Sequence, residues 1–482
     1  MQENKKVREY FERAQERLNQ FRMFQQLGLI PLHGNFCPSG VHYPPIVRYP
    51  AVTQDEVFRG YRIPEDNLLD IYVHFPFCIK KCFFCHYPSL YNASDLQKDL
   101  YLDALEKEMD IYMRVLRTDK IKAHSILIGG GTPTDLTPAQ LKRFLGFFTK
   151  RVDMKKCKQF NYDVDPNTIL GPEGLQRLEI MRDYGVDRLT IGVQSLNDEI
   201  LKKMNRAHDA QMAIDSIFVS RKLGYQLNIE FIFGYPGQTF ENWIDVMEKA
   251  VELPTDEIQL YRLKIEAYGD QQGIIKKISE QHQESLPTPE ETIIMKQMAI
   301  DVLGDHGYSE NLRRVFTKRK SAISHYAYDQ CCLLLDEVGL GLTAFSSLRD
   351  RFILNTQYFK DYYRAIAEQR LPLNRGIHRT TDQQIRWAII LPLKNYFIQK
   401  SIFQERTRIP VSEVFQEKFR LLKDYGLITE TDKRIELTKP GAFLSDDIVQ
   451  QFYETHLIPF PEQDYADGIF NPYAKTESEI LQ

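Results

Sequence analysis

One short segment, residues 69–88, constrains this 482-residue chain more than any other. It begins with an apolar run, LDIYVHF, which predicts a buried strand that ends before Pro76. Three cysteines, Cys78, Cys82 and Cys85, follow directly, with three and then two residues between them. The chain must therefore fold so that a strand delivers three thiols to one tight loop.

Thiolates held this closely together are typical ligands of a metal centre. A [4Fe–4S] cluster takes cysteine thiolates, and a set of three leaves one iron without a protein ligand. A metal with an open position can bind a substrate or cosubstrate. The alternatives are three structural cysteines or a zinc knuckle, but structural zinc usually takes four protein ligands. The loop therefore favours an iron–sulfur cluster with one open iron.

Composition excludes several other kinds of protein. The net charge is −4, so no basic surface for nucleic acid is indicated. No apolar run is long enough to span a bilayer, and the charged N-terminus, MQENKKVREYFERAQERLNQF, does not resemble a signal peptide. Seven cysteines, an odd number, favour a reducing cytoplasmic location over a disulfide framework.

Strand-like and helix-like segments alternate from residue 69 to about residue 265. The strands are near-continuous apolar runs, as expected when both faces of a parallel sheet are buried. The expected strands are residues 69–75, 125–131, 159–165, 188–195, 227–234 and 257–265. Six strand–helix units predict an α/β fold, a partial (β/α)6 barrel that carries its function at the carboxyl ends of the strands. The cysteine loop follows the first strand at this end.

The segments outside this core differ in pattern. Residues 1–68 predict an amphipathic helix and an extended arm, which either reaches the functional site or only covers the barrel. Residues 69–270 form the expected core barrel, and residues 271–375 predict a barrel extension with helices. Residues 376–482 predict a mostly helical C-terminal domain with a short hairpin.

The motif C-x3-C-x2-C after a strand, within YVHFPFCIKKCFFC, resembles the signature of radical S-adenosylmethionine (SAM) enzymes. The sequence around this motif looks like that of the HemN-like subgroup, which is typified by oxygen-independent coproporphyrinogen III oxidase. The resemblance extends to residues 376–482, which are similar to that subgroup's winged-helix-type domain. In this family the open iron chelates the amino and carboxylate groups of SAM. One electron from the cluster then cleaves SAM to methionine and a 5′-deoxyadenosyl radical.

The resemblance also implies which residues bind and react. Cys78, Cys82 and Cys85 would hold the cluster and, with Tyr72, form the catalytic group. The residues implied for SAM binding lie in the loop or near strand ends: Phe84, Gly129, Gly130, Gly131, Thr132, Asp163, Asp165, Gln194, Ser195, Arg206, Phe233, Gly234 and Tyr235. The glycine run would contact the SAM amino group, Arg206 would anchor the SAM carboxylate, and the backbone of residues 233–235 would lie near adenine.

Three positions depart from the family pattern. Tyr87 stands where coproporphyrinogen oxidases carry a further cysteine, and Glu230 replaces an Asp. Asp163 replaces a Glu, so the carboxylate is one methylene shorter. Its contact with SAM then shifts, gains a bridging water, or passes to Asp165.

These departures leave three functions open. The first is radical chemistry on a carbon of a small organic substrate, with or without a second SAM as a methyl or methylene donor. The second is tetrapyrrole chemistry, either oxidative decarboxylation of coproporphyrinogen III or anaerobic haem opening. The third is a haem-binding chaperone. The expected partners are a small-molecule substrate and a reducing protein such as flavodoxin or ferredoxin, without nucleic acid or a membrane.

Overall fold

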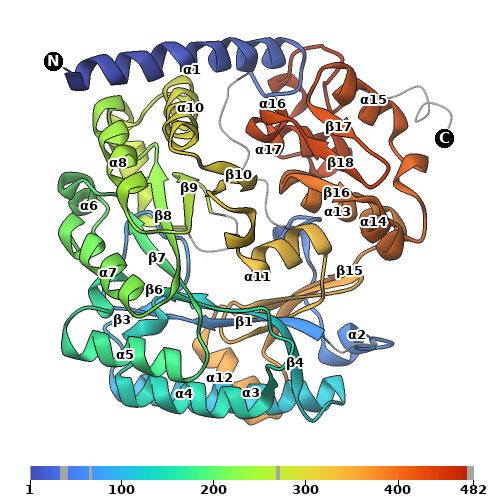
Figure 1. Cartoon of the computed structure of the whole chain (residues 1–482). Helices are drawn as coiled ribbons and strands as arrows, with labels where there is room; N and C mark the ends of the chain where they lie inside the picture. Colours follow the sequence, from blue (N-terminus) through green and yellow to red (C-terminus); the bar gives the residue numbers. More distant parts are fainter. Residues whose placement is uncertain (1, 33–41, 65–67, 268–271, 475–482) are drawn as a thin grey trace.

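A computed structural model describes residues 2–32, 42–64, 68–267 and 272–474. Its centre is an arc of six parallel strands in the spatial order β9-β8-β7-β6-β4-β1 (Figure 1). These strands are β1 (Leu68–Phe75), β4 (Ile121–Gly130), β6 (Gln159–Val164), β7 (Arg188–Gln194), β8 (Gln226–Phe233) and β9 (Glu257–Arg262). The arc does not close on itself, so the predicted partial barrel is confirmed.

Helices connect consecutive strands and cover the outer face of the arc (Figure 1). They are α3 (Asp95–Leu116), α4 (Pro138–Arg151), α5 (Gly171–Asp183), α6 (Asp198–Lys203), α7 (Ala210–Lys222), α8 (Phe240–Glu252) and, after β9, α10 (Pro289–Asp305). Capping boxes at Ser94, Thr137 and Thr239 fix where α3, α4 and α8 begin.

Two strand boundaries differ from the sequence expectation by more than one residue. Strand β4 begins at Ile121 because its first residues pair with the short strand β5 (Val152–Asp153). Strand β9 ends at Arg262, since its partner β8 ends at Phe233 and offers no further pairing.

The two faces of the parallel strands are both buried but differ in chemistry. Along β1, Ile71, Val73 and Phe75 belong to the apolar core, whereas the alternate residues are polar. The polar residues bond to one another across the inner face; they are Asp70, Tyr72 and His74 on β1, Asn161 and Asp163 on β6, Thr190 on β7, Glu230 on β8, and Tyr261 on β9. The expectation of apolar strands was therefore right for the outer face and wrong for the inner one.

Both edges of the arc are extended. Strand β12 (Glu337–Leu340) pairs in parallel with β1, and β13 (Phe345–Leu348), β14 (Arg351–Asn355) and β15 (Leu373–His378) continue antiparallel. At the other edge, β11 (Val315–Thr317) pairs antiparallel with β9 and with β10 (Ser309–Leu312). Helices α11 (His325–Tyr328) and α12 (Phe359–Ala367) lie in the connections.

The N-terminal helix and the arm that follows it pack on two different parts of the barrel. Helix α1 (Gln2–Gln26) lies along α10 and contacts α8 (Figure 1). The arm that follows includes α2 (Gln54–Phe58) and bridges to β15 between Ala51 and Arg375. The ring of His42, earlier in the arm, lies 4.5 Å from that of Phe345, which itself stacks on Tyr72 of β1. The arm thus covers the sheet edge and also reaches side chains beside the inner face.

The C-terminal residues form a separate layer beside the barrel (Figure 1). In chain order the elements are α13 (Thr381–Lys394), β16 (Phe397–Gln399), α14 (Lys400–Thr407), α15 (Gln416–Asp424), β17 (Ile428–Glu430), β18 (Arg434–Leu437), α16 (Lys439–Phe443) and α17 (Ser445–Ile448). The three strands pair antiparallel with β18 in the centre. Within the described part of the chain, no helix is both long and apolar enough to cross a bilayer.

The inner face contains a buried ion pair that yields a stability prediction. The Arg188 guanidinium donates to Glu257 Oε1 at 2.6 Å, and both side chains are 1% exposed. Replacing Glu257 by Gln leaves a buried cation without its counter-charge, so the free energy of unfolding should fall by about 3 kcal/mol in urea denaturation. The exposed pair Lys249–Asp245 provides the control, because Asp245→Asn should change stability by less than about 1 kcal/mol. Equal stability of both variants would contradict this assignment.

Candidate functional site

The cysteine loop begins where β1 leaves the sheet, at the carboxyl edge of the parallel strands. Strand β2 (Phe77–Cys78) pairs with β3 (Leu90–Tyr91), so the loop leaves and returns at one place. The Cys85 N–H donates to the Cys82 carbonyl at 3.2 Å, which puts these two cysteines on one turn.

The residues after α6 hold this loop in place. The Phe83 N–H donates to the Met204 carbonyl at 3.1 Å, and Asn205 Nδ2 donates to the Lys81 carbonyl at 2.7 Å. Asn205 has a φ of 59°, a left-handed conformation that Asn adopts more readily than most residues. The loop is therefore shaped partly by a segment about 120 residues away in sequence.

The three loop thiols are free and electrostatically coupled. Burial raises the pKa of Cys78 to about 12, and the neighbouring thiols Cys85 and Cys82 raise the pKa further. Burial also raises the pKa of Cys85. Thiols in this state need a bound cation to stay deprotonated, which is the role of a metal ligand.

The spread of the sulfur atoms distinguishes between kinds of metal centre. Among the described residues, the group whose ligand atoms all lie within 4.8 Å of one another is Asp70, His124 and Asp329; the loop cysteines do not form such a group. A zinc ion binds sulfur at about 2.3 Å, so its sulfur ligands lie within about 4 Å of one another. The loop therefore does not fit one zinc ion. It fits a cluster in which each thiolate binds a different iron.

Arg206 connects the loop to the ends of two strands. Its Nη1 donates to Cys82 Sγ at 3.0 Å, and its Nη2 donates to Asp165 Oδ2 at 2.6 Å and to the Gly192 carbonyl at 2.7 Å. Burial alone opposes charge on Asp165, but Arg206 and then His208 outweigh it and lower the pKa of Asp165 to about 2. The structure places Arg206 against Cys82 of the loop, with Asp165 as its counter-charge.

The glycine run after β4 lies against both the loop and the inner face. A Cβ on Gly129 would lie 2.5 Å from Asp163 Oδ2, and one on Gly130, whose φ is +109°, would lie 2.8 Å from the His74 ring. The Gly131 and Thr132 N–H groups donate to the carbonyls of Phe75 and Phe77. These amides are therefore already bonded.

The carboxyl groups of Asp163 and Glu230 lie near each other on the inner side of the arc. Burial raises the pKa of Asp163 well above its usual value, and the nearby Glu230 raises the pKa further. Burial raises the pKa of Glu230 to about 7, although hydrogen bonds from Tyr261 and Gln194 act in the opposite direction. A cationic ligand beside this pair would be stabilised by its negative charge once the pair ionises.

The other residues implied for SAM binding lie in the cysteine loop and at or just after the carboxyl ends of β7 and β8. Gln194 has a φ of 66°, at an irregularity of β7 that turns its side chain toward Glu230. Tyr235 donates to the Lys203 carbonyl at 2.9 Å and packs in an apolar cluster with Phe84. Phe233 packs on Trp243, and Ser195 accepts the Asn197 N–H at 3.2 Å in the turn before α6.

Tyr72 occupies the inner face of β1. Its hydroxyl lies 3.0 Å from His74 Nδ1, and its ring edge lies 3.3 Å from the Cβ position of Gly129. Burial raises the pKa of Tyr72 well above its usual value, so the phenol stays protonated.

Sequence reasoning missed several polar neighbours of the site, namely His74, Asn161, Thr190, Arg262 and Lys264. The signal that could have found them is the alternation of polar residues along apolar strands, as in Asn161-x-Asp163 and Arg262-x-Lys264.

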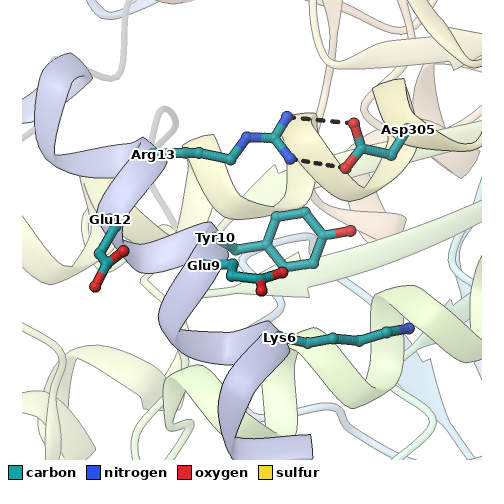
Figure 2. Close-up of a pocket in the computed structure, with 6 residues that line it drawn as sticks. All are labelled: Lys6, Glu9, Tyr10, Glu12, Arg13 and Asp305. Atoms are coloured by element: carbon teal, nitrogen blue, oxygen red, sulfur yellow. Dashed lines mark hydrogen bonds and ion pairs between the residues drawn. The ribbon is translucent and has the colours of Figure 1, made fainter. Parts of the chain in front are cut away.

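A surface pocket of about 560 Å³ lies elsewhere, between helix α1 and the end of α10 (Figure 2). Charged side chains line it, and Arg13 and Asp305 form an ion pair at 2.7 Å. Its lining residues include none from the carboxyl ends of the parallel strands, so it is separate from the cysteine site.

Comparisons with known proteins agree with this geometry. The family model of the radical SAM superfamily matches residues 72–250. The chain is 28% identical over 449 residues to oxygen-independent coproporphyrinogen III oxidase of Escherichia coli K12, covering 89% of this chain and 95% of that protein. It is 25% identical over 388 residues to the heme chaperone HemW of Bacillus subtilis 168, covering 79% and 98%. The solved structure of E. coli coproporphyrinogen III oxidase (HemN) superposes with a TM-score of 0.71 at 26% identity, covering 86% and 96%.

The close approach of Gly131 to the loop yields a prediction. A Cβ at this position would lie 2.5 Å from the Phe77 carbonyl and 2.9 Å from Cys78 Sγ, so Gly131→Ala should displace Cys78. We expect the variant to fold but to hold at least about twofold less iron and sulfide after anaerobic reconstitution. Gly304→Ala in α10 is the matched control, because its Cβ meets nothing within 4 Å. Full iron content in Gly131→Ala would show that the loop tolerates the displacement.

Proposed function

Because the chain contains a radical SAM domain and is homologous to oxygen-independent coproporphyrinogen III oxidase over most of its length, we propose that it modifies a carbon of an organic substrate by reductive cleavage of SAM. The observation that supports this most directly is the cysteine loop. Its three free thiols are spread too widely for one zinc ion, and one of them, Cys82, contacts the cationic Arg206.

Cys78, Cys82 and Cys85 would hold the cluster. When bound, the cluster supplies one electron that splits SAM into methionine and a 5′-deoxyadenosyl radical. Arg206 bonds to Cys82 and to Asp165 after β6. This contact orients the loop and balances part of the negative charge of its thiolates. Asp163 and Glu230 offer negative charge to a cationic sulfonium or ammonium group. Phe84 and Tyr235 provide an apolar wall.

For the substrate, we propose a small organic molecule. Product analysis decides whether a second SAM serves as a methyl or methylene donor. Tyr87, two residues after the last loop cysteine, is 60% exposed. A phenol at this position cannot do the thiol chemistry of the cysteine that coproporphyrinogen oxidases carry there. Asp163 and Glu230 also depart from the family pattern, and both lie on the inner face of the arc.

Two other functions have their own support. Tetrapyrrole chemistry is favoured by the E. coli oxidase, of which the chain covers 95%. A haem-binding role is favoured by the B. subtilis chaperone, of which the chain covers 98%. A protein with the third function would bind haem and would not turn over SAM.

The first test is product analysis after anaerobic reconstitution with iron and sulfide. With dithionite and SAM, the wild type should release 5′-deoxyadenosine, and Cys82→Ala should release none because one iron loses its ligand. Cys157→Ala, which removes a cysteine outside the loop, is the control and should keep activity. A search for S-adenosylhomocysteine in the same samples tests for a second SAM. Haem binding without 5′-deoxyadenosine would favour the chaperone instead.

A second test concerns Asp163. Asp163→Asn keeps the volume and the hydrogen bond from Asn161 but removes the carboxyl group that would ionise beside a cationic ligand. SAM affinity should fall roughly tenfold, since a hydrogen bond to a charged group contributes about 1.5–3 kcal/mol. Iron content should stay unchanged. Equal SAM affinity of variant and wild type, measured by equilibrium dialysis under argon, would remove Asp163 from the binding site.

A further inference from the structure

Three residues of types that bind metal ions meet near the amino ends of β1 and β4, at the opposite end of β1 from the cysteine loop. Asp70 lies on β1, His124 lies on β4, and Asp329 directly follows α11. His124 Nδ1 lies 2.7 Å from Asp329 Oδ2 and 3.8 Å from Asp70 Oδ1. Each side chain offers one ligand atom, and the three atoms all lie within 4.8 Å of one another. Segments that are distant in sequence therefore bring two carboxyl groups and an imidazole to one point.

The spacing of these three atoms suits a single metal ion. Bonds of about 2.1 Å from a metal to oxygen and imidazole nitrogen separate neighbouring ligand atoms by roughly 3–4 Å. The contact of His124 with Asp329 is shorter because a proton joins the two atoms, and a metal ion would replace that proton. The side chains of Asp70 and Asp329 are 0% and 1% exposed, and that of His124 is 18% exposed. A bound ion would thus be enclosed, with access from the side of His124.

Hydrogen bonds hold the Asp70 carboxyl group in a fixed direction. Its Oδ1 accepts from Ser125 Oγ at 2.6 Å, and its Oδ2 accepts from Gln330 Nε2 at 2.7 Å. Gln330 also donates to the Leu335 carbonyl at 3.2 Å, so it is anchored at both sides. Each carboxylate oxygen has a second lone pair that can bind a metal ion. Bonds of this kind orient carboxylate ligands around metal ions in proteins.

A third carboxyl group beside this cluster has an oxygen without a partner. Glu337 of β12 pairs in register with Asp70, so both side chains point to the same face of the sheet. Glu337 Oε1 accepts from the Tyr326 hydroxyl at 2.8 Å, but Oε2 is buried and has no hydrogen-bond partner among the described residues. The Glu337 residue is 1% exposed. A buried oxygen without a partner is unfavourable, and a cation beside Asp70 would satisfy it.

Three carboxyl groups therefore share this buried place with one imidazole. Burial raises the pKa of Asp70 above its usual value, and the nearby Asp329 raises it further. Burial also raises the pKa of Glu337, and Asp70 contributes in the same direction. The hydrogen bond with Asp329 raises the pKa of His124. All three shifts favour protons on the cluster, which is the effect of negative charges that lie close together out of water.

A mixed set of carboxylate and imidazole ligands suits zinc, manganese and ferrous iron. We propose that Asp70, His124 and Asp329 bind one divalent transition-metal ion, with Glu337 as the fourth ligand. Four protein ligands make a closed site of the structural kind. The ion would join the amino end of β1, the strand that carries the cysteine loop, to β4 and to the segment after α11. The site does not depend on SAM cleavage.

Two variants each remove one ligand with little change in shape. In His124→Asn the side-chain amide can still donate from the position of Nδ1, and in Asp329→Asn the amide oxygen can still accept. Both should therefore fold, and if Asp329→Asn does not, His124→Asn decides the outcome. Asp305→Asn is the matched control, because it removes one carboxylate from a side chain of α10 that is 45% exposed and pairs with Arg13.

The probes are Mn²⁺ and Zn²⁺, each added under argon to the reconstituted holoenzyme, whose loop thiols the cluster occupies. Binding is measured by equilibrium dialysis with elemental analysis. The wild type and Asp305→Asn should bind one ion per chain of at least one of the two metals, and that metal should raise their thermal unfolding midpoint. The affinity should fall at least about tenfold in His124→Asn and Asp329→Asn, since each lacks a ligand. Iron and sulfide content should be the same in all four proteins.

Three results would overturn the proposal. The wild type binds neither metal, or both ligand variants bind as tightly as the wild type, or Asp305→Asn loses affinity to the same extent as they do. The last result would show an effect of overall charge rather than of a site. Metal binding that depends on Asp329 in a protein that releases no 5′-deoxyadenosine would count against the proposed function and leave the metal site standing.

Discussion

The contact between Arg206 and Cys82 is the interaction on which the rest of the site depends. One guanidinium bonds to a loop thiol, to Asp165 at the end of β6 and to a carbonyl at the end of β7. Because these partners lie on three different elements, the loop cannot move without breaking charged hydrogen bonds in a buried setting. The strand ends and the thiols are thereby held in a single arrangement before any cofactor binds.

Farther from the loop, hydrogen bonds also hold the side chains on the inner face of the arc. Several alternate positions of its strands carry polar side chains, and these form hydrogen bonds with one another. Carboxyl groups that are buried in this way keep a proton until a positive charge arrives. Toward the C-terminal layer the side chains are cationic instead, because Arg313, Arg314 and Lys394 lie around Asp446.

The parts that sequence could predict are those that neighbouring residues determine. The cysteine loop, the glycine run and the strand-end carboxyl group Asp163 follow from strand order, because the carboxyl ends of parallel strands lie at one edge of a sheet. The zinc alternative was open until the sulfur positions were known. The ion pair of Arg313 with Asp446 could not be predicted, because the two residues lie 133 apart in the chain and neither lies in a recognisable motif. Polar residues alternate with apolar ones along these strands in the sequence, but the apolar residues dominate the pattern and led to the prediction of strands that are apolar on both faces.

Helix α1 has a consequence that reaches far from the N-terminus. Its arginines pair with both ends of α10, Arg22 with Glu290 and Arg13 with Asp305, and its apolar stripe covers that helix. Helix α10 also carries Lys296, which lines a cavity of about 20 Å³ together with Arg314. Helix α1 therefore braces this side of the barrel from outside, so cleavage within it would loosen α10 while leaving the cysteine loop intact.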